Sequence, residues 1–182
     1  ENKMLSKIIG RTFLGILLLF FIGGCGSMKP SDFSNGKPTF VLEEYFSGKT
    51  KAWGIFVDRF GTVKRQFTVD IEGSWNGEQL VLDEKFDFDD GEKSTRAWKI
   101  VKTGDNNYEG TADDVVGVAK GISSGNALNW KYILDLKIGD NSINVSFDDW
   151  MFLQSDGVLI NRAKMTKLGL EMGIVNIFFK KL

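Results

Sequence analysis

Eight residues carry most of the chemistry that this sequence offers, and their spacing places each on the inward face of a predicted strand. They are Arg65, Glu84, Arg96, Trp98, Trp130, Tyr132, Asp149 and Arg162. The set holds three arginines against two carboxylates, which leaves a positive surplus. A surplus guanidinium beside a tyrosine, within apolar walls, suits the carboxylate or phosphate head group of an amphiphile. We therefore predict that these residues form a ligand-binding site.

The same charged residues also have a purely structural interpretation. A buried charge has to be paired, because an isolated one costs several kcal/mol. Glu84 with Arg96, and Asp149 with Arg162 or Lys164, would then be ion pairs that are satisfied within the core. The sequence leaves both interpretations open.

The residue types restrict catalysis. The chain contains no histidine, which excludes histidine-activated nucleophiles as well as histidine-ligated zinc and haem. Cys25 is the only cysteine. We therefore predict a protein that is not an enzyme and that holds no metal or cofactor. An enzyme built on carboxylates, with Asp149 essential for turnover of a lipid or glycan, remains the alternative.

Strand patterns must position these residues. Val63–Glu72 alternates strictly between apolar and polar residues, Asn76-Gly77 marks a hairpin turn, and Leu80–Phe88 returns. Further strands are predicted at 94–100, 127–138, 142–153 and 158–165, and Ile174–Phe179 suits a closing strand. About ten strands in succession from Thr39, with no convincing amphipathic helix between them, predict an all-β, antiparallel, up-and-down lipocalin-like barrel. A β-sandwich is the alternative fold.

Turn lengths then predict which residues face one another across neighbouring strands. A two-residue turn at Asn76-Gly77, a three-residue loop before β-strand 94–100, a loop over Gly139–Ser142 and a turn at Asp156-Gly157 set the registers. The predicted pairs are Phe67 with Phe86, Glu84 with Arg96, Tyr132 with Asp149, Met151 with Arg162, and Asp149 with Lys164. A slip of one residue would reverse the facing of a whole strand.

The N-terminal residues predict export and lipidation. Lys7 and Arg11 precede a short apolar run over 13–21, which is followed by Ile22-Gly23-Gly24-Cys25. This order is typical of a secretory signal peptide, and its end resembles the lipobox of bacterial lipoproteins. We predict a signal peptide over 1–24, a lipidated Cys25 with a linker over 25–38, and a barrel domain over 39–182. A plain signal peptide or an uncleaved anchor are the alternatives.

The charge balance limits the partners. The formal net charge is −1 at pH 7, which argues against nucleic acid as a partner because proteins that bind it usually carry a basic patch. The expected partners are instead a membrane, through the lipid on Cys25, and a fatty acid or phospholipid ligand. The sequence identifies no protein partner.

Several stretches together carry a family resemblance. They are Asp58-Arg59-Phe60-Gly61, Glu84-Lys85-Phe86, Arg96-Ala97-Trp98, Gly110-Thr111-Ala112-Asp113-Asp114-Val115 and Asp148-Asp149-Trp150-Met151. Their combination is similar to the domain-of-unknown-function 3833 family of proteobacterial lipoproteins, over nearly all of the mature chain. The resemblance implies a lipocalin-like lipoprotein of the cell envelope, at the periplasmic face of the outer membrane. It implies no catalytic residues.

Two functions follow as hypotheses. The first is a membrane-tethered binder or carrier of a lipid or other amphiphile in the barrel cavity. The second is an envelope interaction or structural lipoprotein whose barrel is filled. In that case the exterior would act, and Trp150 and Phe152, predicted to face outward, would form part of a docking patch.

Overall fold

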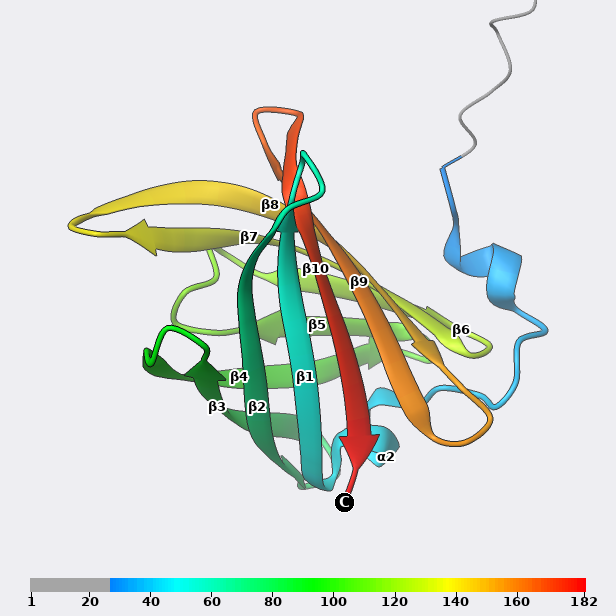
Figure 1. Cartoon of the computed structure of the whole chain (residues 1–182). Helices are drawn as coiled ribbons and strands as arrows, with labels where there is room; N and C mark the ends of the chain where they lie inside the picture. Colours follow the sequence, from blue (N-terminus) through cyan, green and yellow to red (C-terminus); the bar gives the residue numbers. More distant parts are fainter. Residues whose placement is uncertain (1–26) are drawn as a thin grey trace, which may run out of the picture.

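Antiparallel strands that each hydrogen-bond to the next in the chain close into a barrel, because β10 returns to β1 (Figure 1). The structure is a computed structural model and describes residues 27–182. Within these residues the strands are β1 (Gly48–Asp58), β2 (Val63–Trp75), β3 (Gln79–Phe88), β4 (Lys93–Gly104), β5 (Asn107–Thr111), β6 (Ala119–Ser124), β7 (Ala127–Ile138), β8 (Asn141–Leu153), β9 (Val158–Lys167) and β10 (Leu170–Lys181). The predicted antiparallel barrel of about ten strands is confirmed. The predicted signal peptide and the lipidation site at Cys25 lie outside the described residues.

Alternation within each strand decides which side chains enter the barrel. In β2, Val69 and Ile71 are buried while Asp70 and Glu72 are exposed. In β3, Leu80, Leu82 and Glu84 are buried on the same inward face. Because neighbouring residues of a strand point to opposite faces, the apolar positions of every second residue build the core.

The hairpin registers agree with the predictions at one site and differ by two residues at two others. Glu84 lies opposite Arg96, as predicted. Phe67 pairs with Phe88, because the last pair of this hairpin is Trp75 with Leu80, and the Asn76 side-chain oxygen accepts from the N–H groups of Glu78 and Gln79 within the turn. Tyr132 pairs with Phe147, because the loop after β7 has only two residues. A slip of two residues keeps the facing, so these side chains still point inward.

The turn between β8 and β9 corrects one prediction. Leu153 pairs with Leu159, so the pairing of β8 with β9 is shifted by one residue from the predicted register. Arg162 therefore pairs with Trp150 and is exposed on the outside of the barrel, and Lys164 lies opposite Asp148 instead of Asp149. The predicted inward position of Arg162 is wrong, and Asn161 takes the inward position.

A short helix that the alternation pattern did not indicate closes one end of the barrel. Helix α2 (Leu42–Phe46) precedes β1 and buries Leu42, Tyr45 and Phe46. The Tyr45 hydroxyl donates to the carbonyl oxygens of Gly157 and Phe179, at 3.1 and 3.2 Å. The predicted series of strands from Thr39 therefore begins only at Gly48, and α2 lies at the end of the barrel that also holds the C-terminus (Figure 1).

The expected linker packs against the outside of the barrel. Its 3-10 helix η1 (Pro30–Phe33) places the Phe33 ring 5.7 Å from the Trp150 ring and 5.1 Å from the Phe152 ring, between centroids. The backbone N–H of Phe40 then donates to the Gly125 carbonyl oxygen at 2.8 Å. Trp150 and Phe152 do face outward, as predicted, but this chain's own Phe33 covers them. No helix within residues 27–182 has the length and apolar character needed to cross a membrane.

Candidate functional site

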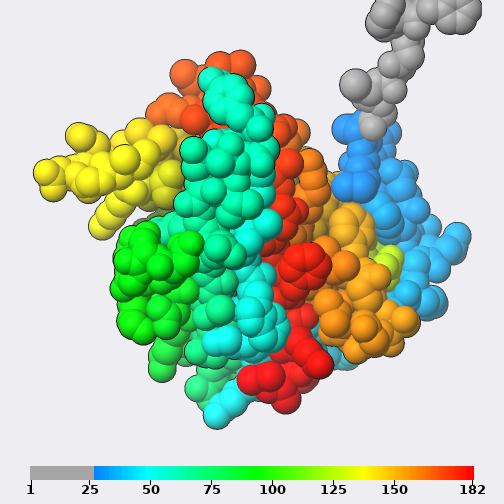
Figure 2. All heavy atoms as spheres, viewed as in Figure 1, coloured from blue at the N-terminus to red at the C-terminus, as the bar shows by residue number. Residues whose placement is uncertain are grey.

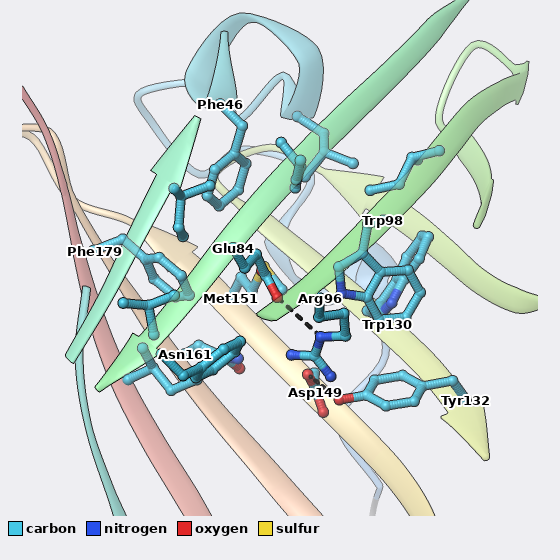
Figure 3. A pocket seen from close by; sticks show the side chains of 17 residues that line it. Phe46, Glu84, Arg96, Trp98, Trp130, Tyr132, Asp149, Met151, Asn161 and Phe179 are labelled. Atoms are coloured by element: carbon cyan, nitrogen blue, oxygen red, sulfur yellow. Dashed lines mark hydrogen bonds and ion pairs between the residues drawn. The ribbon is translucent and has the colours of Figure 1, made fainter. Parts of the chain in front are cut away.

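Polar side chains from five strands meet inside the barrel (Figure 3). Glu84 of β3 and Arg96 of β4 form an ion pair with 2.9 Å between Oε2 and Nε. The Tyr132 hydroxyl of β7 donates toward Asp149 Oδ2 of β8 at 3.5 Å. Asn161 of β9 lines the same space and is almost fully buried.

Aromatic rings form a wall around this polar group. The Trp98 ring lies 5.7 Å from the Trp130 ring and 5.4 Å from the Tyr132 ring, in edge-to-face arrangements. The Trp130 ring fits only because Gly121 has no side chain, since a Cβ there would clash with a carbon of the ring. Trp98, Trp130 and Tyr132 thus line the cavity, and the Arg96 guanidinium carbon lies 5.5 Å from the Trp98 ring centroid.

The space between these residues is a small cavity. Its volume is about 90 Å³, and Leu42 and Phe46 of α2 line it together with the strands. Such a volume holds about three water molecules at about 30 Å³ each. Typical ligand pockets measure about 300–1,000 Å³. This cavity by itself is therefore too small for a typical ligand, but a larger hollow of about 780 Å³, which Asp114 also lines, meets it at Ile71, Glu84 and Arg96.

Asp149 and Asn161 each leave one buried side-chain oxygen in the cavity without a hydrogen-bond partner among the described residues, and Asp149 is the ionisable one of the two. Its side chain is 5% exposed, and its Oδ1 atom has no hydrogen-bond partner among the described residues. Burial raises the pKa of Asp149 to about 7, and the Asn161 side chain and the Arg96 charge lower this pKa only in part. The carboxyl group thus changes charge near neutral pH and keeps one oxygen free for a hydrogen-bond donor.

The Glu84–Arg96 pair is strongly coupled. Burial raises the pKa of Glu84, and the neighbouring Arg96 charge opposes that effect. Burial alone would lower the pKa of Arg96, but Glu84, Tyr132 and Asp114 raise it above its ordinary value. Arg96 therefore stays charged, and its Nε and Nη1 atoms donate to carboxylates that belong to this chain.

Two predicted binding arginines do not reach the cavity. The Arg65 guanidinium stacks 3.6 Å from the centroid of the Phe88 ring and pairs with Asp90 at 2.8 Å and Glu92 at 2.6 Å. Arg162 faces outward, as described above. The predicted positive surplus is therefore wrong. One interior arginine stands among carboxylates.

Sequence reasoning missed Asn161 and Asp114. The signal for Asn161 was present, because Leu159, Ala163 and Met165 make its face of β9 the more apolar one. Asp114 lies in the connection between β5 and β6, where no alternation of apolar and polar residues indicates which side chains face the interior. Its Oδ2 atom is 3.5 Å from Arg96 Nη1.

The Arg96–Asp114 contact spans a weak point in the barrel wall. The Lys93–Trp98 half of β4 pairs with β3, whereas β5 joins β4 only from Lys99 onward. The connection over 112–118 hydrogen-bonds to β7 instead, and no main-chain hydrogen bond within the described chain ties it to Lys93–Trp98. The Arg96 and Asp114 side chains are 22% and 40% exposed. Solvent therefore reaches the polar cluster at this point.

Comparisons with known proteins agree with this architecture. The sequence model of the DUF3833 family, described as proteins of unknown function, matches residues 19–181. The chain belongs to this family. The DUF3833 chain is also similar to the solved structure of an S-type phycobiliprotein lyase from Guillardia theta, with a TM-score of 0.54 at 8% sequence identity, over 84% of this chain and 96% of that one. This likeness supports the lipocalin-like barrel. A comparison with curated proteins finds no match.

A metal site in the DUF3833 protein would take several acidic side chains in one place. Among the residues that the structure describes, no three side chains of the metal-binding types converge. Glu84 and Asp114 instead form ion pairs with the Arg96 guanidinium, and Asp149 lines the same cavity. The arrangement is suited to binding a polar group in an apolar setting.

Proposed function

We propose that this protein binds a lipid or other amphiphile inside its barrel, without turning it over, and that a lipid on Cys25 tethers it to a membrane of the cell envelope. The observation that carries the first part is the free Oδ1 atom of buried Asp149, which lies beside an aromatic cavity. Buried polar atoms normally have partners, so a missing one suggests a group that the bound ligand supplies. The lipocalin-like architecture supports a binding role.

The charges favour one type of polar end for that ligand. A carboxylate or phosphate would face Glu84, Asp114 and Asp149 and would compete with them for Arg96. A hydroxyl or ammonium group can instead donate to Asp149 Oδ1. An ammonium would also gain from the faces of Trp98 and Trp130, because aromatic rings attract cations. The polar end that we propose is therefore a hydrogen-bond donor.

An amphiphile requires a larger space than the cavity of about 90 Å³. The Arg96–Asp114 contact is long and partly exposed, and exposed ion pairs contribute about 0–1 kcal/mol. Displacement of the 112–118 connection from β4 would therefore cost little electrostatic energy. We propose that the ligand enters there and widens the cavity.

The test is lipid extraction and mass spectrometry on protein purified from membranes. The wild type is compared with Asp149→Asn, which removes the charge at nearly constant volume, and with Asp83→Asn, the same change at an exposed position on β3. We expect a defined amphiphile in the wild type and in Asp83→Asn, and its loss from a folded Asp149→Asn. A folded wild type without any bound amphiphile would contradict the proposal.

The small cavity favours a second candidate, a filled barrel that acts as an interaction or structural protein through its exterior. This candidate predicts that crosslinking in the envelope captures one specific protein. It also predicts that Asp149→Asn leaves that crosslink unchanged, because the interior would serve only the fold.

A further inference from the structure

Two neighbouring hairpin tips expose large apolar side chains at the end of the barrel opposite α2. Phe60, between β1 and β2, is 78% exposed, and Leu168 and Leu170, at the β9–β10 turn, are 95% and 65% exposed. The tips are adjacent, because β1 pairs with β10 as far as Asp58 opposite Gly173. The Arg59 N–H also donates to the Met172 carbonyl oxygen at 3.1 Å. Both hairpins project from the top of the molecule (Figures 1 and 2).

Leu168 is an unfavourable choice for a turn in water. Leu168 and Gly169 form a two-residue hairpin loop with φ values of 49° and 80°. Loops with two positive φ angles strongly favour Asn-Gly, because a larger L side chain resists this backbone conformation. Within residues 27–182, Leu168 is the only residue other than glycine with positive φ. A strained backbone that holds a fully exposed leucine indicates a requirement other than folding.

The neighbours of these apolar residues indicate a lipid surface. The Arg59 guanidinium lies 4.8 Å from the Phe60 ring centroid, and Lys167 directly precedes Leu168. Apolar points beside long cationic side chains suit the boundary of a bilayer, where the apolar part inserts and the charge stays at the head groups. Two narrow protruding tips fit a protein partner poorly, because a stable interface needs about 800 Å² of complementary surface on each side.

The start of the described chain supports the same partner. Ser27, the first described residue, follows Cys25 by two positions, and two extended residues span about 7 Å. In Figure 1 the N-terminal end of the described chain lies toward the same end of the molecule as the two tips. A lipid on Cys25 would therefore hold this end near the membrane; this step rests on the anchor in the proposed function.

We propose that Phe60, Leu168 and Leu170 insert into the interfacial region of the bilayer and that the barrel stands on these two hairpins. The tips then act as a second membrane contact, which fixes the orientation of the barrel. The end closed by α2 points away from the lipid.

The test uses the mature chain from residue 25 onward carrying Cys25→Ser, so that neither a covalent lipid nor the apolar run over 13–21 contributes and an introduced cysteine is the only thiol. Leu168→Cys is labelled with an environment-sensitive fluorophore and mixed with vesicles of phosphatidylethanolamine and phosphatidylglycerol. Ile138→Cys is the matched control, because Ile138 is 55% exposed at the tip of the β7–β8 hairpin. We expect a blue shift and quenching by brominated lipid at position 168 alone. The same aqueous environment at both positions would overturn the proposal.

Vesicle co-sedimentation gives a second readout in the same background. Replacement of Phe60, Leu168 and Leu170 by serine should weaken vesicle binding by roughly tenfold or more, since burial of apolar side chains drives interfacial binding. Leu168→Asn should weaken binding and raise the melting temperature, because asparagine tolerates this backbone. Unchanged binding in both variants would contradict the proposal. Mass spectrometry of wild-type Cys25 tests the anchor separately, so that either part can fail alone.

Discussion

The buried carboxyl of Asp149 makes the protein's stability depend on pH in a way that one substitution isolates. Burial raises the pKa of Asp149 from 3.8 to about 7. Between these two values the folded state binds more protons at this position than the unfolded state does, so the free energy of unfolding falls as the pH rises and levels off above pH 7. A shift of about three units corresponds to on the order of 4 kcal/mol at about 1.4 kcal/mol per unit.

Asp149→Asn removes this ionisation and nearly conserves the volume. At about pH 8.5 the variant should be more stable than the wild type by a few kcal/mol, whereas near pH 4 the two should differ little. Urea unfolding at both pH values measures the difference. Asp83→Asn, an exposed neighbour of Glu84, serves as the control and should show no such dependence. A difference between wild type and Asp149→Asn that is equal at the two pH values would refute the argument from burial.

Two further predictions concern the ion pair and the N-terminal segment. Arg96→Ala should lower the free energy of unfolding by about 3 kcal/mol, because it leaves Glu84 buried without its partner. Replacement of both residues by leucine should lower the free energy of unfolding by less. If urea unfolding shows an equal or greater loss for the double variant, the result counts against the pairing. Phe33→Ala should cost about 1–2 kcal/mol and increase acrylamide quenching of tryptophan fluorescence, because it uncovers Trp150. Exposed Met28→Ala is the control for the second prediction, and quenching that matches this control would show that Phe33 does not shield the ring.

The inward facing of most site residues could be predicted because alternation along a strand is a local property. Glu84, Arg96, Tyr132 and Asp149 each occupy the apolar face of their strand, and the structure places all four in the cavity. The registers after β2 and β7 differ from the predicted ones by two residues. These shifts left the predicted side chains facing the interior, because a shift of two residues does not change the face on which a side chain lies. The prediction failed for β9. The register between β8 and β9 differs from the predicted one by a single residue, which turns Arg162 outward and Asn161 inward.

The sequence by itself determined the antiparallel barrel and the family, because strand periodicity and a distributed motif pattern are both properties of the linear chain. Tertiary structure alone decided the sign of the charge in the interior. Arg65 is held at the rim by Asp90 and Glu92, Arg162 points outward, and Asp114 arrives from an aperiodic connection. It also decided that α2 closes the barrel and that Phe33 covers Trp150. These features depend on loop geometry and on contacts between segments distant in the chain, which no local pattern encodes.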